Sequence, residues 1–125
     1  MKKKITSSSR IPVSGPYSAA VEAHDLIFIS GQLPIDPATG QMIDDIRKAT
    51  RQVLSNIREI LSKTDLDLSS IVKTTIFLKS IKDFPAVNDV YAEFFPEEPP
   101  TRSTIEVSVL PRGAIIEIEA IATRK

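Results

Sequence analysis

The sequence contains no cysteine and no tryptophan, and its only histidine is His24. The absence of cysteine excludes disulfides, thiol catalysis and thiolate metal sites. A single histidine cannot form a histidine cluster, and the segment EAHDL places His24 beside an expected turn, which favours a surface position. No apolar run approaches the ~20 residues that a membrane-spanning helix requires. We therefore expect a protein with no structural metal and no membrane segment.

Neither sign of charge is in excess. Lys plus Arg and Asp plus Glu number 16 each, so the formal net charge at pH 7 is zero. This balance gives no electrostatic reason to expect nucleic acid or a membrane surface as a partner. The lysines at positions 2–4 precede a polar stretch, so no signal peptide is predicted, and the cytoplasm is the expected location.

The length and apolar content suit one domain with a packed core. The chain has 125 residues, of which 42% are hydrophobic, and residues 1–125 are expected to form a single domain. Gly31 stands alone, without the further glycines of a phosphate-binding loop.

Hydrophobic periodicity predicts the order strand, helix, strand, helix, strand, strand. An amphipathic helix is expected over roughly 44–63, and a second helical stripe follows Ser80, Asp83 and Pro85 as far as Phe95. A loop rich in Ser, Pro and Gly leads into a short strand before His24, and the main strands are expected at 26–30, 71–79, 102–109 and 115–123. This order indicates an α/β sandwich with both helices on one face of the sheet.

Side chains alternate between the two faces of a strand, and we assign the apolar set of each strand to the helices. That set comprises Val72, Ile76, Leu78, Ser103, Ile105, Val107, Val109, Ile116, Ile118, Ala120 and Ala122. The opposite face would mix Phe77 and Ile121 with Arg102 and Glu117. Such a face suits either a subunit interface or an ordinary solvated surface, and both remain open.

The remaining chemistry lies in one arginine and in the carboxylates of the last strands. Arg102 follows Pro99 and Pro100, and its guanidinium suits bidentate recognition of a carboxylate. Glu117 lies between isoleucines, where partial desolvation would raise its pKa and suit it to acid–base work. Spacing alone leaves a simpler interpretation, a salt bridge from Arg102 to Glu106 or Glu117.

Longer segments resemble the RidA family of YjgF-like reactive intermediate deaminases. They are GPYSAAV (15–21), ISGQLPIDPATG (29–40), IVKTTIFLKSIKDFPAVNDVYAEFF (71–95) and PPTRSTIEVSVLPRGAIIEIEAIA (99–122). The resemblance implies a chorismate-mutase-like fold with a mixed sheet. It also implies that the last strand inserts between the strands near 26–30 and 71–79, whereas the local pattern alone predicts a hairpin through LPRG.

The resemblance further implies a homotrimer whose sheets form a central barrel, with active sites between subunits. The implied activity is cofactor-independent hydrolysis of 2-imino acids and enamines, such as 2-aminoacrylate and 2-iminobutyrate, to 2-keto acids and ammonia. These intermediates are released by PLP-dependent dehydratases and damage other PLP enzymes.

The family's functional positions map onto this sequence residue by residue. Arg102 matches the carboxylate-binding arginine and Glu117 the glutamate that positions water. The other matched substrate-binding positions are Tyr17, Ser30, Gly31, Asn88 and Thr104. Many bacterial members have cysteine where this chain has Thr104, and only the backbone N–H at that position is expected to serve the same purpose here.

Two other functions stay open. A trimer that binds or senses a small keto acid without turnover would need Arg102 but would need Glu117 far less. Cleavage of RNA, with inhibition of translation, is a third possibility, and the zero net charge argues against it.

Overall fold

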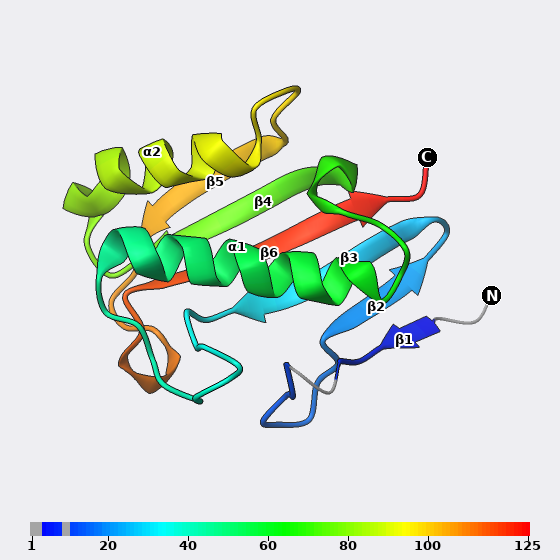
Figure 1. The fold of residues 1–125 in the computed structure, drawn as a ribbon, viewed down its shortest axis with the longest axis horizontal. Coiled ribbons are helices and arrows are strands. Elements are labelled where there is room, and N and C mark those ends of the chain that lie inside the picture. The colour runs from blue at the N-terminus through cyan, green and yellow to red at the C-terminus, as the bar shows by residue number, and fades with distance from the viewer. Residues whose placement is uncertain (1–3, 9–10) are drawn as a thin grey trace.

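The computed structural model describes residues 4–8 and 11–125, in which two helices cover one face of a six-stranded sheet (Figure 1). Part of the lysine run at positions 2–4 lies outside the described residues. The helices are α1 (Ile46–Ser62) and α2 (Phe84–Phe94), with short 3₁₀ turns η1 (Leu68–Ser70), η2 (Ile81–Asp83) and η3 (Pro111–Gly113). The strands are β1 (Lys4–Thr6), β2 (Ala20–Ala23), β3 (Leu26–Gln32), β4 (Ile71–Leu78), β5 (Thr101–Glu106) and β6 (Ile116–Thr123).

The order of strands across the sheet is β1-β2-β3-β6-β4-β5. β6 pairs antiparallel with both β3 and β4, so the predicted insertion of the last strand is confirmed and the hairpin through LPRG is wrong. β5 instead pairs parallel with β4, because α2 forms the crossover that a parallel connection requires. The predicted architecture, a mixed sheet with both helices on one face, is confirmed.

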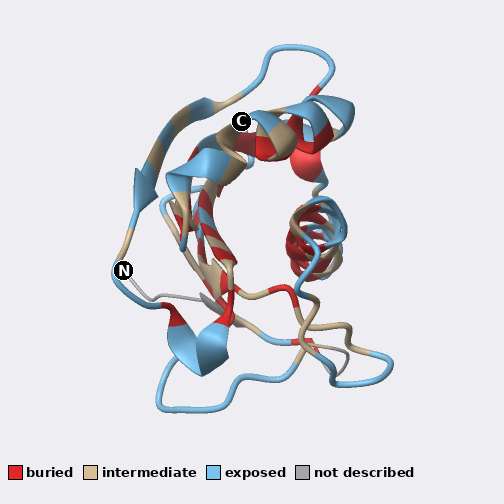
Figure 2. Ribbon diagram, turned by 90° about the vertical axis from the view of Figure 1, so that its left-hand side faces the viewer, coloured by how far each residue is buried: buried red, intermediate tan, exposed pale blue. Residues whose placement is uncertain are grey.

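Helix α1 begins and ends close to its predicted limits. The carboxylate of Asp45 accepts a hydrogen bond of 3.0 Å from the backbone N–H of Lys48 and so caps the helix. Its buried stripe faces the sheet and comprises Ala49, Thr50, Val53, Leu54, Asn56, Ile57, Ile60 and Leu61. In Figure 2 the buried residues of α1 lie on the side that faces the strands.

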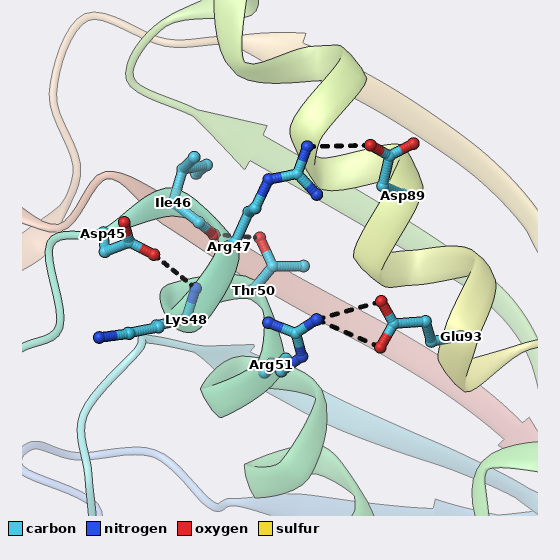
Figure 3. Close-up of polar contacts among 8 residues, drawn as sticks. All are labelled: Asp45, Ile46, Arg47, Lys48, Thr50, Arg51, Asp89 and Glu93. Atoms are coloured by element: carbon cyan, nitrogen blue, oxygen red, sulfur yellow. Dashed lines mark hydrogen bonds and ion pairs between the residues drawn. The ribbon is translucent and has the colours of Figure 1, made fainter.

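Two ion pairs join the outer sides of the helices (Figure 3). Nη2 of Arg47 lies 2.9 Å from Oδ2 of Asp89, and Nη2 of Arg51 lies 3.1 Å from Oε2 of Glu93. All four side chains are roughly half exposed, so each pair contributes no more than about 1 kcal/mol. The pairs link α1 to α2 and add little to overall stability.

The core lies between the helices and one face of the sheet. Ile76, Leu78, Ile116 and Ile118 are fully buried there, as their alternation predicts. Val72 departs from that prediction and is 43% exposed, because the β4–β6 register shifts between Ile71 and Lys73. Such an irregularity moves one side chain to the other face.

The turn between β2 and β3 contains His24 and Asp25, both with positive φ. His24 is exposed, which confirms the predicted surface position. Neither helix of the described chain combines the length and apolar character that crossing a bilayer demands.

Candidate active site

The edge strand β5 turns its polar side chains toward α2, and this corrects our assignment of its faces. The parallel register pairs Arg102 with Thr74 and Thr104 with Ile76, and both partners are buried on the helix side. Paired residues share a face, so Arg102 and Thr104 face the helix. Ile105, which we had placed on the helix side, is 46% exposed on the other face. Val109 lies beyond the end of β5 and is 81% exposed.

The guanidinium of Arg102 lies over two aromatic rings of α2. Its Cζ is 4.9 Å from the ring centroid of Tyr91 and 5.4 Å from that of Phe84, within the range of cation–π attraction. Within residues 4–8 and 11–125, no carboxylate forms an ion pair with Arg102, and Glu106 instead accepts a hydrogen bond of 2.9 Å from the N–H of Ile81. The simpler interpretation, a salt bridge from Arg102 to Glu106 or Glu117, is therefore wrong. The planar fork of N–H donors on Arg102 has the geometry that matches a carboxylate.

Asn88 and Thr104 share the sides of α2 and β5 that the rings and the guanidinium occupy. Asn88 follows Phe84 by four residues and precedes Tyr91 by three, so it occupies the same side of α2 as the two rings. Oγ1 of Thr104 is buried and has no hydrogen-bond partner in the described chain. We call Asn88, Arg102 and Thr104 the Arg102 group.

Tyr91 supports the Arg102 group, although the sequence indicated only that it belongs to an apolar helical stripe. Its hydroxyl forms a buried hydrogen bond of 2.7 Å with Oγ1 of Thr74. Burial raises the pKa of Tyr91, against smaller opposing effects of Thr74 and of the Arg102 charge. The phenol therefore stays neutral and holds β4 and α2 together beneath the guanidinium.

Glu117 lies on the opposite face of the sheet. The β4–β6 register pairs it with Phe77, one residue from the buried Ile116 and Ile118. Burial and, to a smaller extent, the nearby charge of Glu119 raise the pKa of Glu117. No hydrogen bond or ion pair within the described chain engages its carboxylate, so Glu117 is available to accept a proton.

Gly31 lies directly against the Glu117 side chain. A Cβ at position 31 would collide with the carboxylate and would lie 2.8 Å from its carbon atom, so any other residue here would displace the Glu117 side chain. The β3–β6 register shifts between Ile29 and Gln32, and this bulge brings the Gly31 backbone to that position.

Ser30 and Tyr17 complete this side. Oγ of Ser30 donates a hydrogen bond of 2.6 Å to the backbone oxygen of Ser18 and so fixes the loop that carries Tyr17. The Tyr17 ring, whose residue is 50% exposed, packs over Gly15, where a Cβ would lie only 3.3 Å from the ring. We call Tyr17, Ser30, Gly31 and Glu117 the Glu117 group.

The structure thus gathers the predicted residues into two groups and does not bring the groups together. Arg102 faces the helices, whereas Glu117 faces away from them. A small molecule bound to Arg102 of one chain cannot reach Glu117 of the same chain through the sheet. A site that uses both residues needs a second copy of the chain.

In the part of the chain that the structure describes, no three His, Cys, Asp or Glu side chains are arranged so that they could hold a metal ion.

Comparison with known proteins identifies the relatives of this chain. Residues 7–124 match the model of the family described as Endoribonuclease L-PSP. Reactive Intermediate Deaminase A, chloroplastic, of Arabidopsis thaliana is 46% identical over 98% of this chain and 67% of its own length. The 2-iminobutanoate/2-iminopropanoate deaminase of Bos taurus is 44% identical over 98% of this chain and 90% of its own. The crystal structure of E. coli TdcF with bound serine has a TM-score of 0.93 and 37% identity, and the match covers 98% of this chain and 99% of that one.

Proposed function

The chain belongs to the endoribonuclease L-PSP family, which includes RidA-type deaminases, and from this premise we propose that it hydrolyses reactive 2-imino acids and enamines. The products are 2-keto acids and ammonia. The observation that carries the proposal is the half-buried guanidinium of Arg102, which lies over two rings and has no carboxylate partner within the described chain. A planar carboxylate on the substrate matches that fork of donors.

The chemistry requires few groups, because imines already react with water. Arg102 and the backbone N–H of Thr104 hold the substrate carboxylate. The amide of Asn88 forms the rest of the Arg102 group's part of the site. Glu117 accepts a proton from water as the water oxygen bonds to C2 of the imine. It then returns that proton to the imine nitrogen, which gives a carbinolamine. The carbinolamine then collapses: the hydroxyl proton passes to the amino nitrogen as the C–N bond breaks, so that ammonia leaves and the keto group forms. Holding water and imine together supplies most of the advantage.

A homotrimer would supply the second copy that this site needs. In the proposed assembly, the Glu117 group of one subunit faces the Arg102 group of its neighbour. The sheet face that would be covered carries apolar side chains that water solvates poorly, such as Phe28 (43% exposed) and Ile105 (46% exposed).

Mixing two inactive variants tests this assembly. Arg102→Ala and Glu117→Ala each disable every site of their own trimer. In trimers reassembled from equal amounts of both, about a quarter of the sites combine intact Arg102 with intact Glu117. We expect about that fraction of wild-type activity. A stable monomer in sedimentation, or no recovery despite subunit exchange, contradicts the shared site.

The activity itself is tested with freshly made imines. An amino-acid oxidase or dehydratase generates 2-iminopropionate or 2-iminobutyrate in the presence of semicarbazide. The protein should slow formation of the semicarbazone from the imine and speed release of ammonia. If it leaves both rates unchanged for several imines, it is not a deaminase.

The alternatives are separate outcomes of the same study. A keto-acid sensor would bind 2-oxobutanoate and raise its melting temperature with it, yet leave imine decay unchanged. The family description favours testing RNA as well, so the protein is incubated with a single-stranded RNA. Sixteen basic residues balance sixteen acidic ones, so we expect no cleavage.

The cytoplasm is the compartment that we propose. The Arabidopsis relative is named as chloroplastic, so family membership does not by itself determine the compartment. Fractionation of the source cells tests the proposal.

A further inference from the structure

A pocket of about 390 Å³ opens beside the Glu117 group. Tyr17 and Gly31 form part of its lining. Half of the remaining lining residues are apolar, namely Ile11, Pro12, Val13, Leu33, Ile35 and Pro37, and the others are Ser14, Gln32, Asp36, Gly40, Asn56 and Arg112. Pockets of this size and character hold small organic ligands. Neither the carboxylate clamp nor the attacking water in the proposed mechanism uses this space.

The wall of the pocket is held in place before any ligand arrives. Asn56 of α1 is buried, and its Nδ2 donates hydrogen bonds to the backbone oxygens of Leu33 (3.3 Å) and Ile35 (3.0 Å). Gln52 in turn donates a hydrogen bond of 2.8 Å to Oδ1 of Asn56. Isolated pairing of Ile35 with Met42 closes the loop that follows. The segment after β3 is therefore fastened to α1, so the pocket is preformed.

The charged members of the lining are Asp36 and Arg112. Oδ1 of Asp36 accepts a hydrogen bond of 2.8 Å from the N–H of Ala38, so this carboxylate stabilises its own turn. Arg112 is exposed to solvent.

Gly31 joins the pocket to the proposed chemistry. It lines the pocket, and its α-carbon lies against the Glu117 carboxylate. The carbon that water attacks must lie within reach of a water held by Glu117. With that carbon in place, a side chain that extends past Gly31 and Tyr17 would enter the pocket.

We propose that this pocket receives the side chain of the imino acid, and that it selects apolar side chains of about four or more carbons. The inference rests on the proposed function and adds the substrate class. The volume exceeds by many times the ~30 Å³ that one water occupies in the liquid, so a leucine-sized side chain fits. Each additional apolar group that leaves water on binding strengthens the discrimination.

The test fills the pocket and measures the ratio of two substrates. An L-amino-acid oxidase makes the imines of leucine and alanine, and kcat/KM is measured for each with wild type, Ile35→Phe and Val13→Phe. Wild type should favour the leucine imine. Each larger side chain should lower the leucine-to-alanine ratio by about tenfold.

Ile81→Phe is the matched control. Ile81 is 44% exposed, close to the 40% of Val13, and lies outside the pocket lining. This variant should keep the wild-type ratio. Because Val13 is exposed, Val13→Phe should fold even if Ile35→Phe does not, and circular dichroism checks both.

If neither filled variant lowers the ratio more than threefold, the pocket does not receive the side chain. That result leaves the deaminase proposal intact as long as wild type hydrolyses either imine. If wild type hydrolyses neither imine, the deaminase proposal fails. The binding of keto acids then tests whether the pocket receives the ligand side chain. In that case 4-methyl-2-oxopentanoate should raise the melting temperature more than pyruvate does, and Val13→Phe should remove the difference. An equal effect of both keto acids overturns the inference.

Discussion

The Arg102 group and the Glu117 group occupy opposite faces of one sheet and are built in different ways. The Arg102 group lies under α2, where two rings hold the guanidinium and a buried Tyr91–Thr74 hydrogen bond ties the helix to the sheet. The Glu117 group lies on the face without helices, where Gly31 packs on a carboxylate that no other side chain in the described chain engages. In one chain, contacts with α2 therefore hold the Arg102 side chain, whereas no hydrogen bond or ion pair within the described residues engages the Glu117 carboxylate. The difference predicts that the two groups fail in different ways when they are altered.

The largest expected effect comes from Glu117→Gln. The amide keeps the size and can still orient water, but it cannot exchange the proton. We expect kcat to fall about 100- to 10,000-fold, with keto-acid binding preserved. Single-turnover kinetics and calorimetry separate the two quantities. Full activity would move the acid–base role elsewhere, with Glu119 the next candidate.

Arg102→Lys tests the other group. Lysine keeps the charge but loses the planar fork, a difference worth roughly 2 to 3 kcal/mol for a charged bidentate contact. We expect kcat/KM to fall about 30- to 150-fold, with the melting temperature close to that of wild type. Activity within twofold of wild type shows that Arg102 does not hold the substrate. A collapse of folding would show instead that the arginine is structural.

A smaller effect is expected on the pH profile. The nearby charge of Glu119 contributes to the raised pKa of Glu117. Glu119→Gln removes that repulsion, so the pKa of Glu117 should fall and the acidic limb of the kcat profile should move to lower pH. Burial, the larger cause, remains, so the limb stays above that of an exposed glutamate. An acidic limb that stays in place, or moves to higher pH, would show that the titration of Glu117 does not set the pH profile of kcat.

The smallest effect concerns the ion pairs between the helices (Figure 3). Asp89→Asn with Glu93→Gln should cost about 0.5 kcal/mol for each exposed pair. Because α2 carries Asn88 and the two rings, KM should rise up to about twofold with kcat unchanged. Lys125→Gln, which removes the exposed Lys125–Asp25 pair, is the control and should leave KM unchanged. An equal loss in kcat would mean that the helices also position the Glu117 group.

Local pattern was enough to predict the helices, since α1 has a cap at Asp45 and a sustained apolar stripe. It failed at β5, where the side that faces α2 carries Arg102 and Thr104 and the exposed side carries Ile105. The rule that apolar side chains face the core places Ile105 inward. Polar residues that face inward instead mark a place where function outweighs packing. The resemblance placed both residues in one pocket, and the separation of Arg102 from Glu117 emerges only when the register of every strand is known.

The position of β6 bears on how the chain acquires its structure. β6 lies between β3 and β4, yet both of those strands are synthesised before it. Until Ile116–Thr123 has been made, the inner edges of β3 and β4 remain unpaired, and the two apolar strands are free to associate with other chains. Contacts between β6 and β3 join residues about ninety positions apart, so sheet closure is a slow, long-range event. A chain whose synthesis stops before residue 116 would leave the edges of β3 and β4 that normally pair with β6 exposed, and it would therefore be prone to aggregate.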